Sequence, residues 1–222
     1  MSAPMIIVCA PSGSGKTTIL KSLFQARPDL HFSVSHTTRP PRPKEQEGAD
    51  YYFVTPSVFE DMIAQNDFLE YVHNYDHYYG TSRRPLEKAL RQGQTVILDL
   101  ETEGVARVKG LYPTSLSIFI LPPSLQALKD RLYGRGDESP VQLKLRMAQV
   151  AQQFGQASQF DFILLNDNQA HAQAQLSELI KALETHDKDR VDEMSRATQA
   201  YQPLLKTLHD EALTSHEGTK DS

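Results

Sequence analysis

The sequence is poor in cysteine, in excess basic charge and in long apolar runs. Its 222 residues include one cysteine, Cys9, which excludes a disulfide framework or a cysteine metal site within one chain. The formal net charge of −5 argues against general nucleic-acid binding, which is typical of basic chains. No apolar run approaches a membrane span in length, and no signal-type segment opens the chain. We therefore expect a cytoplasmic protein that binds neither nucleic acid nor membrane.

The chain also lacks internal repeats and low-complexity tracts, and its eight histidines have no metal-ligand spacing. Its length fits one α/β domain with embellishments. Short apolar runs alternate with helical patterns, which predicts a parallel sheet with helices on both faces. Among the strands we expect one over 31–35 and one over 94–100. Residues 187–222 suggest one more helix, with about ten disordered residues at the end.

A phosphate-binding loop follows the first apolar run. Met5–Cys9 reads as a strand and a helical pattern starts at Lys16; between and across them lie Ala10, Pro11, Ser12, Gly13, Ser14, Gly15, Lys16, Thr17 and Thr18. Strand, Gly-rich turn, Lys-Thr and helix in this order are typical of a P-loop, although Ala10 replaces its first glycine. Backbone N–H groups would cradle phosphate, Lys16 would reach the β- and γ-phosphates, and Thr17 would hold Mg²⁺. The alternative is an ordinary Gly/Ser turn, but the coincidence of all four features favours a nucleoside triphosphate site.

A second candidate anion site lies in a proline-stiffened basic segment. Arg39 and Arg42 are three residues apart on it, and two forked guanidinium groups suit a phosphate. Taken alone, the segment would be interpreted as a solvated loop with scattered charge.

The sequence around these arginines resembles the guanylate kinase family. The family signature is T-[ST]-R followed at fixed spacings by a basic residue, an acid, a glycine, a tyrosine and an aromatic residue; these places are filled by Thr37, Thr38, Arg39, Arg42, Glu45, Gly48, Tyr51 and Phe53. The likeness extends to about residue 185. It implies a P-loop fold with a small β-rich GMP-binding insertion and a helical lid, and an enzyme that converts ATP and GMP, and by extension dGMP, to ADP and the diphosphate.

The resemblance also implies a GMP site. The monophosphate would be held by Arg39, Arg42, Tyr51 and Tyr79, and the guanine by Ser35, Glu70 and Thr81, with Gly80, Asp99, Glu101 and Arg146 completing the set. The chemistry fits, because a carboxylate accepts from guanine N1–H and the 2-amino group, while a hydroxyl serves O6. Adenine reverses this pattern. Taken singly, Glu70 could be an exposed strand carboxylate and the tyrosines could be core residues.

An acidic segment follows the strand over 94–100. The family motif Asp-x-Asp-x-Gln-Gly corresponds here to Asp99, Glu101, Glu103 and Gly104, so two positions depart from it. Asp99 would order Mg²⁺ through water, together with Thr17. Glu101 would either read the guanine 2-amino group or point to solvent or to the metal's waters.

The remaining triphosphate ligands are implied near the lid and in the last strand. Arg131, Arg135 and Arg146 would reach the triphosphate, and Asn166 would lie near the adenine, while Tyr133 stands where a third arginine is common. The catalytic set is Lys16, Arg39, Arg42, Arg135 and Arg146. No side chain needs to be a nucleophile, because the GMP phosphate oxygen attacks the γ-phosphorus directly.

The implied organisation is a guanylate kinase-like domain over 1–185 and a tail over 186–222. Within the domain we expect a core over 4–34, 82–130 and 140–185, a GMP-binding insertion over 35–81 and a lid over 131–139. Two alternatives are a non-catalytic interaction module and a kinase of a phosphorylated sugar. The intact P-loop opposes the first, and the guanine-binding set opposes the second. Monomer and homodimer both stay open.

Overall fold

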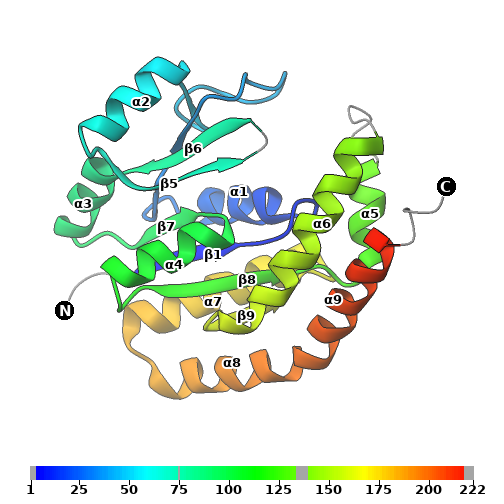
Figure 1. Cartoon of the computed structure of the whole chain (residues 1–222). Coiled ribbons are helices and arrows are strands. Elements are labelled where there is room, and N and C mark those ends of the chain that lie inside the picture. The colour runs from blue at the N-terminus through cyan, green and yellow to red at the C-terminus, as the bar shows by residue number, and fades with distance from the viewer. Residues whose placement is uncertain (1–3, 75, 134–139, 218–222) are drawn as a thin grey trace. The chain divides into compact units, whose positions relative to one another are not determined.

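The computed structural model describes residues 4–74, 76–133 and 140–217. Strands alternate with helices along the chain (Figure 1). The chain forms two compact units. Unit 1 consists of Met1–Ile7 and Pro28–Leu116, and unit 2 of Val8–Arg27 and Ser117–Ser222. The chain therefore passes between the units three times: within its first strand, after Arg27 and after Leu116.

The larger sheet has the strand order β2-β7-β1-β8-β9. Its strands are β1 (Met5–Cys9), β2 (His31–Phe32), β7 (Val96–Asp99), β8 (Leu116–Leu121) and β9 (Phe162–Leu165). β2 runs parallel to β7 in unit 1, and β9 runs parallel to β8 in unit 2. All five residues of β1 are buried, as expected for a parallel strand covered on both faces. This is the α/β architecture that the sequence predicts.

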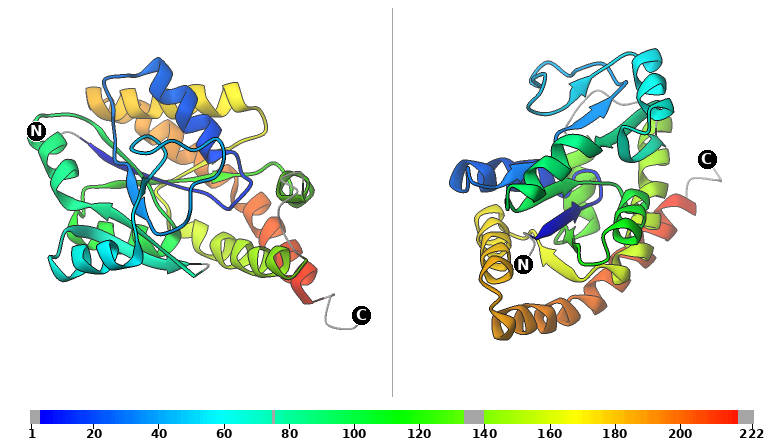
Figure 2. Two further views of the ribbon diagram at one scale, coloured as in Figure 1. Left: turned by 90° about the horizontal axis from the view of Figure 1, so that it is seen from above. Right: turned by 90° about the vertical axis from the view of Figure 1, so that its left-hand side faces the viewer.

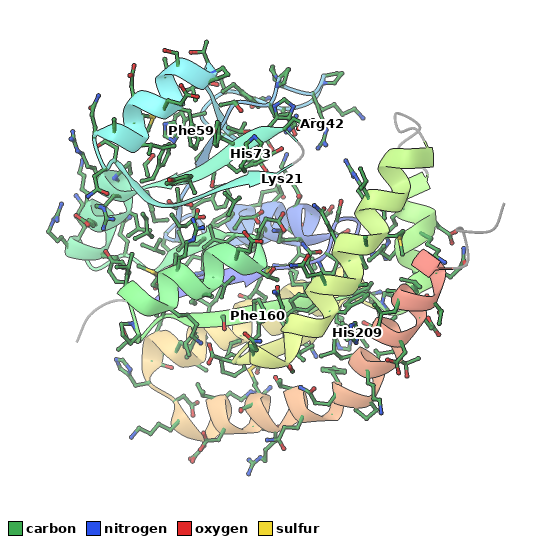
Figure 3. The ribbon with its side chains drawn as sticks, in the orientation of Figure 1. Lys21, Arg42, Phe59, His73, Phe160 and His209 are labelled. Carbon is green, nitrogen blue, oxygen red and sulfur yellow. The ribbon has the colours of Figure 1, made fainter. Side chains whose placement is uncertain are left out.

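Unit 1 also contains a four-stranded sheet with the order β4-β3-β6-β5. Its strands are β3 (Ser35–Thr37), β4 (Tyr52–Phe53), β5 (Phe68–Asn74) and β6 (His77–Ser82), and the helices of the unit are α2 (Pro56–Ala64), α3 (Arg83–Arg91) and α4 (Thr102–Leu111). The buried Phe59 ring anchors α2 (Figure 3), because it stacks on Phe68 at 4.3 Å and on Tyr78 at 5.1 Å between ring centroids. Thr55 caps α2 by accepting a 3.3 Å hydrogen bond from the Val58 N–H.

Unit 2 is mainly helical around β8 and β9. Its helices are α1 (Lys16–Ala26), α5 (Leu125–Tyr133), α6 (Pro140–Gln156), the 3₁₀ turn η1 (Ala157–Gln159), α7 (Gln169–Thr185), α8 (Lys188–Ala200) and α9 (Gln202–Glu217). Phe119 of β8 centres the core and meets Phe154 and Phe160 edge-on, at 6.4 and 5.2 Å between centroids. α1 packs on α7 and is tied to it by the Arg27–Glu184 ion pair at 2.9 Å.

The predicted strand over 31–35 is wrong in its extent. Only 31–32 forms β2, where the His31 and Ser33 N–H groups donate to carbonyls beside and within β7. After Val34 the chain leaves that sheet, and Ser35 begins β3 in the other one. One extended segment thus contributes a strand to each of the two sheets. A pattern of apolar and polar residues does not reveal where the chain changes from one sheet to the other.

The single helix expected in the tail is also wrong, because two helices form there. α8 ends before Tyr201, and α9 starts at Gln202 with Pro203 in its first turn. Proline fits the first turn of a helix but cannot continue a preceding one, so the chain changes direction at this point. α9 then runs beside α6 (Figure 2) and continues to Glu217, well into the stretch expected to be disordered.

Candidate active site

The loop between β1 and α1 has the backbone curl of a phosphate-binding loop. Gly13 and Gly15 take the left-handed conformation, with φ of 88° and 91°. The Ser14 N–H donates to the Pro11 carbonyl, and the Thr18 N–H donates to the Gly15 carbonyl, each at 3.1 Å. Only glycine adopts such angles without strain, which is why the motif requires glycine at these two positions. The N-terminal end of α1, which carries the positive end of the helix dipole, therefore begins at Lys16, directly after a tight turn that requires the two glycines.

Asn166 supports this loop from the end of β9. Its buried side-chain amide donates to the Ser14 carbonyl at 2.6 Å. A methyl group on Gly15 would collide with the same amide, so Gly15 is required by close packing as well as by φ. The sequence associates Asn166 with the adenine; in the structure its amide N–H is committed to the loop backbone.

The Ser14 hydroxyl is an orphan in the loop. Its oxygen is buried and has no hydrogen-bond partner among the described residues. An unpaired buried hydroxyl costs about 1–3 kcal/mol. A ligand with many acceptor oxygens would satisfy it, and a nucleotide phosphate provides them.

Two arginines reach the loop from other helices. Arg131, near the end of α5, donates to the Gly13 and Ser14 carbonyls at 3.4 Å, and Arg146 of α6 donates to the Ser12 hydroxyl at 3.4 Å. These distances lie at the outer limit for a hydrogen bond, so Arg131 can exchange a carbonyl, and Arg146 a hydroxyl, for a phosphate oxygen. Arg135 lies outside the described residues.

The predicted guanine-binding residues form one row across unit 1. Ser35 of β3 lies opposite Thr81 of β6, and Glu70 of β5 lies opposite Thr81 on its other side. Directly opposed residues present their side chains to the same face of a sheet. A bulge between Phe68 and Glu70 shifts the register and places Glu70 in the row. The sequence thus identifies three residues that the sheet brings together.

Glu70 is a buried carboxylate with a defined partner. The Thr81 hydroxyl donates to its Oε1 at 2.7 Å. Burial raises the pKa of Glu70 above its usual range; the hydrogen bond from Thr81 and the charge of Arg107 oppose this rise, and the charge of Glu101 adds to it. The second oxygen lies against α4, where a methyl group on Gly104 would come within 2.9 Å of it. Glu70 is therefore held as a directed acceptor.

Arg39 is held ready by an acid that the signature contains. Its guanidinium donates to both oxygens of Glu45 at 2.8 and 2.9 Å, and the Arg42 N–H donates to the same carboxylate at 2.8 Å. Burial alone would raise the pKa of Glu45, but these hydrogen bonds and the two positive charges lower it. Glu45 thus organises both arginines, a role that sequence reasoning did not assign to it.

Two tyrosines complete this cluster. The Arg39 guanidinium lies over the Tyr51 ring at 5.5 Å, and the Tyr51 and Tyr79 rings meet at 6.0 Å between centroids. Arg42 is more exposed. Arg39, Tyr51 and Tyr79 therefore form one cluster of side chains in unit 1.

Paired hydroxyls fix the start of the arginine loop. The Thr37 hydroxyl donates to the Tyr78 carbonyl at 2.9 Å and accepts from the Arg39 N–H at 3.1 Å. The Thr38 hydroxyl accepts from the Tyr78 N–H at 2.9 Å. The two threonines of the signature therefore set the direction in which Arg39 leaves the sheet.

The acidic segment after β7 lies beside the guanine row. Asp99 ends β7 half-buried, and Glu101 is the N-cap residue of α4, close enough for its charge to act on Glu70. Arg107 of α4 balances these acids, donating to the Tyr71 carbonyl while its guanidinium lies 5.9 Å from the Tyr71 ring. No motif in the sequence singles out Arg107.

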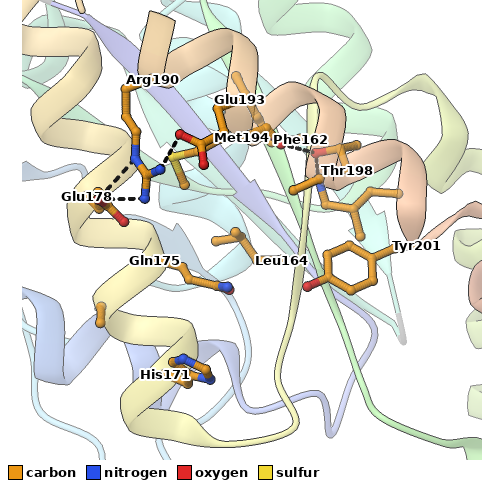
Figure 4. A pocket seen from close by; sticks show the side chains of 13 residues that line it. Phe162, Leu164, His171, Gln175, Glu178, Arg190, Glu193, Met194, Thr198 and Tyr201 are labelled. Carbon is orange, nitrogen blue, oxygen red and sulfur yellow. Dashed lines mark hydrogen bonds and ion pairs between the residues drawn. The ribbon is translucent and has the colours of Figure 1, made fainter.

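A further cavity in unit 2 has different chemistry. It measures about 390 Å³ and lies among β9, α7 and α8, with Leu164, Gln175 and Tyr201 in its wall (Figure 4). At its rim Arg190 pairs with Glu178 at 2.7 Å and also with Glu193, so that arginine is already neutralised. None of the predicted site residues lines this cavity.

Metal and membrane features can be stated for the described residues only. No group of three or more His, Cys, Asp and Glu residues in them could hold a metal ion. None of the described helices has the length and apolar character needed to cross a membrane.

The fold and the loop together define a P-loop nucleotide-binding protein. The family model for guanylate kinase matches residues 2–183. The chain is 43% identical over 179 residues to a guanylate kinase of Thiobacillus denitrificans, covering 81% of this chain and 86% of the relative. It is 38% identical over 213 residues to one of Symbiobacterium thermophilum, covering 96% of each.

A solved structure agrees with this assignment. The crystal structure of guanylate kinase from Anaplasma phagocytophilum matches with a TM-score of 0.69 and 25% identity, covering 82% of this chain and 87% of that one. The chain belongs to the guanylate kinase family.

Proposed function

We propose that this enzyme binds GMP on the face of Ser35, Thr81 and Glu70 and ATP on the P-loop, and transfers the γ-phosphate between them. Membership of the guanylate kinase family makes the chain a GMP kinase that uses ATP. The observation that best supports the residue assignment is the row formed by Ser35, Thr81 and Glu70. A non-catalytic module would have no need of the intact loop Gly13–Thr17.

The chemistry needs alignment more than a reactive side chain. A phosphate oxygen of GMP attacks the γ-phosphorus while the bond to the ADP oxygen breaks, so the phosphoryl group changes partner and ADP leaves. Lys16 neutralises charge on the triphosphate, and Arg39 and Arg42 hold the attacking phosphate. Arg131, Arg135 and Arg146 add positive charge where the transferred group passes.

Base choice follows from the acceptor character of Glu70. An ionised carboxylate accepts from guanine N1–H and the 2-amino group, and the Ser35 hydroxyl can donate to O6, whereas the Thr81 hydroxyl already donates to Glu70. Adenine presents an acceptor at N1, which would face Glu70 without a proton between them. This mismatch disfavours AMP by a factor of about 10⁴, the range seen where a buried polar group loses its partner.

Mg²⁺ would be held with ATP by hard oxygen donors. The Thr17 hydroxyl is exposed at the start of α1, and the Asp99 carboxylate is half-buried at the end of β7. Hydroxyl, carboxylate and phosphate oxygens, with water, are the ligands that Mg²⁺ prefers. When bound, the ion would neutralise charge on the β- and γ-phosphates.

The proposed organisation keeps the predicted boundaries. The kinase domain spans 1–185, with its GMP-binding insertion over 35–81 and lid over 131–139, and the tail spans 186–222. A cytoplasmic location, with monomer and homodimer both open, completes the proposal. The chain has one cysteine, Cys9, which is buried, and such sparse use of cysteine suits a reducing compartment.

A coupled ADP-release assay tests the proposal. ATP is offered with GMP, dGMP, AMP or ribose 5-phosphate, with EDTA and added Mg²⁺ as a second axis. We expect turnover with GMP and dGMP that EDTA removes and Mg²⁺ restores. The Glu70→Gln variant should lose most kcat/KM for GMP. Equal turnover of GMP and AMP, or an unchanged value in Glu70→Gln, would overturn the base-binding assignment.

A further inference from the structure

The last helix packs on the two helices that supply arginines to the P-loop. α9 contacts α6 and α5 in unit 2, and its residues Leu205, Leu208 and Ala212 are buried. Figure 1 shows the last turns of α9 near the lower end of α5. The family model ends at residue 183, so α9 is an addition beyond the part that the model describes.

A polar bond joins α9 to α5. The Lys129 ammonium donates to the Ser215 hydroxyl at 2.9 Å, and the pair is partly buried. Lys129 lies two residues before Arg131, which reaches the Gly13 and Ser14 carbonyls. The position of the end of α5, and with it the reach of Arg131, is therefore fixed in part by α9.

A close approach joins α9 to α6. His209 of α9 (Figure 3) lies over Gly155, where an added methyl group would come within 3.2 Å of the His209 Nε2. The small residue lets the two helices approach closely. α6 also carries Arg146, which donates to the Ser12 hydroxyl.

We propose that α9 positions Arg131 and Arg146 for ATP by clamping α5 and α6. The three hydrogen bonds from these arginines to the loop are each 3.4 Å long, so a shift of either helix by about half an ångström would break them. Lys129, His209 and Ser215 join α9 to α5 and α6, and they act through these helices as positioning residues. The proposal rests on the assignment of the triphosphate to the P-loop.

Three single substitutions, compared with two controls, distinguish a positioning role of α9 from a purely stabilising one. Lys129→Met and Ser215→Ala remove the polar bond singly and together, and Gly155→Ala presses on His209. Ser215→Thr keeps the hydroxyl, and Leu213→Ala changes a side chain that is 44% exposed on the same helix. For each variant, KM for ATP, KM for GMP, kcat and Tm are measured on the full chain.

We expect KM for ATP to rise about 3- to 10-fold and kcat to fall in the first three, with KM for GMP within about 2-fold of the parent. Lys129→Met and Ser215→Ala together should cost no more than either alone, since they remove one bond. Ser215→Thr and Leu213→Ala should behave like the parent.

Two outcomes would overturn the role of α9. One is a fall in Tm with all kinetic constants unchanged; the other is an equal change in the two KM values, which indicates a general loss of structure. If Gly155→Ala does not fold, the Lys129 and Ser215 variants still test the role proposed for α9. A parent without ATP:GMP activity would instead sink the proposed function, whatever the variants do.

Discussion

At the scale of single residues, the site depends on groups that are held by a neighbour before any ligand arrives. Arg39 is fixed by Glu45, Glu70 by Thr81, and the Ser14 carbonyl by Asn166. Each of these is a hydrogen bond of 2.6–2.8 Å within the protein itself. Such preorganisation reduces the free energy that binding must spend on ordering side chains.

Lys16→Ala should abolish turnover and leave the fold intact. The lysine opens α1 beside the loop, and its charge matters most while negative charge spreads over the transferred phosphoryl group. We expect kcat to fall at least about 10²-fold, with an unchanged circular dichroism spectrum. Activity within a few-fold of the parent would refute the assignment of Lys16.

Glu101 is predicted to discriminate GMP from IMP, which lacks the 2-amino group. Its charge acts on Glu70, so the two acids lie in one neighbourhood of unit 1. Glu101→Gln and Glu101→Ala should lower the GMP/IMP ratio of kcat/KM by about 10-fold or more, the cost of a poorly paired polar group. If both substrates lose equally, Glu101 belongs to the metal or the solvent instead.

At the scale of elements, the arginine loop between β3 and β4 is stabilised by ionisation. Glu45 bridges the Arg39 side chain and the Arg42 backbone, and its pKa is lowered in the folded chain. The element is therefore built around a charge that strong acid removes. The same loop carries both proposed phosphate-binding arginines.

Glu45→Gln should make the free energy of unfolding less dependent on pH in the acid range. A carboxyl with a lowered folded-state pKa contributes stability above its unfolded value of about 4.5, and this is lost as pH falls through the folded value. Urea unfolding between about pH 3 and 7 should show a smaller loss in the variant. KM for GMP should also rise in the variant, because the Arg39 guanidinium loses its carboxylate partner. An identical pH profile would show that the ion pair contributes nothing.

The sequence predicts elements whose signals are local. The P-loop follows from a short motif, and the row of Ser35, Thr81 and Glu70 follows from the family resemblance. Contacts that depend on tertiary approach were not predicted: Arg107 near Glu70, the Asn166 bond to the loop, and α9 against α6. Helical periodicity can indicate a buried face, but it does not name the element that covers it.

At the scale of the whole molecule, the two ligand chemistries fall into different compact units. The proposed GMP residues other than Arg146 belong to unit 1, and the described ATP residues belong to unit 2. A residue that lowers the stability of one unit can therefore contribute to the binding of one of the two substrates. The buried carboxyl group of Glu70 in unit 1 is such a feature.

Glu70→Gln should stabilise the free protein while impairing it. A carboxyl whose pKa is raised by folding opposes stability increasingly as pH rises through the folded value. Gln keeps the acceptor for Thr81 and carries no charge, so Tm should rise by about 2–4 °C at pH 8 and differ less at pH 5. Thermal melts at both values, beside kcat/KM for GMP, measure this trade-off. A variant less stable than the parent at pH 8 would contradict it.

Burial of Glu70 also couples GMP recognition to protons in solution. Guanine N–H donors favour the charged carboxylate, so the raised pKa should fall on binding, and each GMP bound should expel a fraction of a proton near the free-state value. Calorimetric titrations in two buffers of unequal ionisation enthalpy would then give unequal heats, and Glu70→Gln would remove the part of the difference due to Glu70, leaving the part due to the GMP phosphate, whose second pKa is about 6. Equal heats for the parent from about pH 5 to 7 would contradict this linkage. GMP affinity should accordingly weaken as the medium becomes acidic.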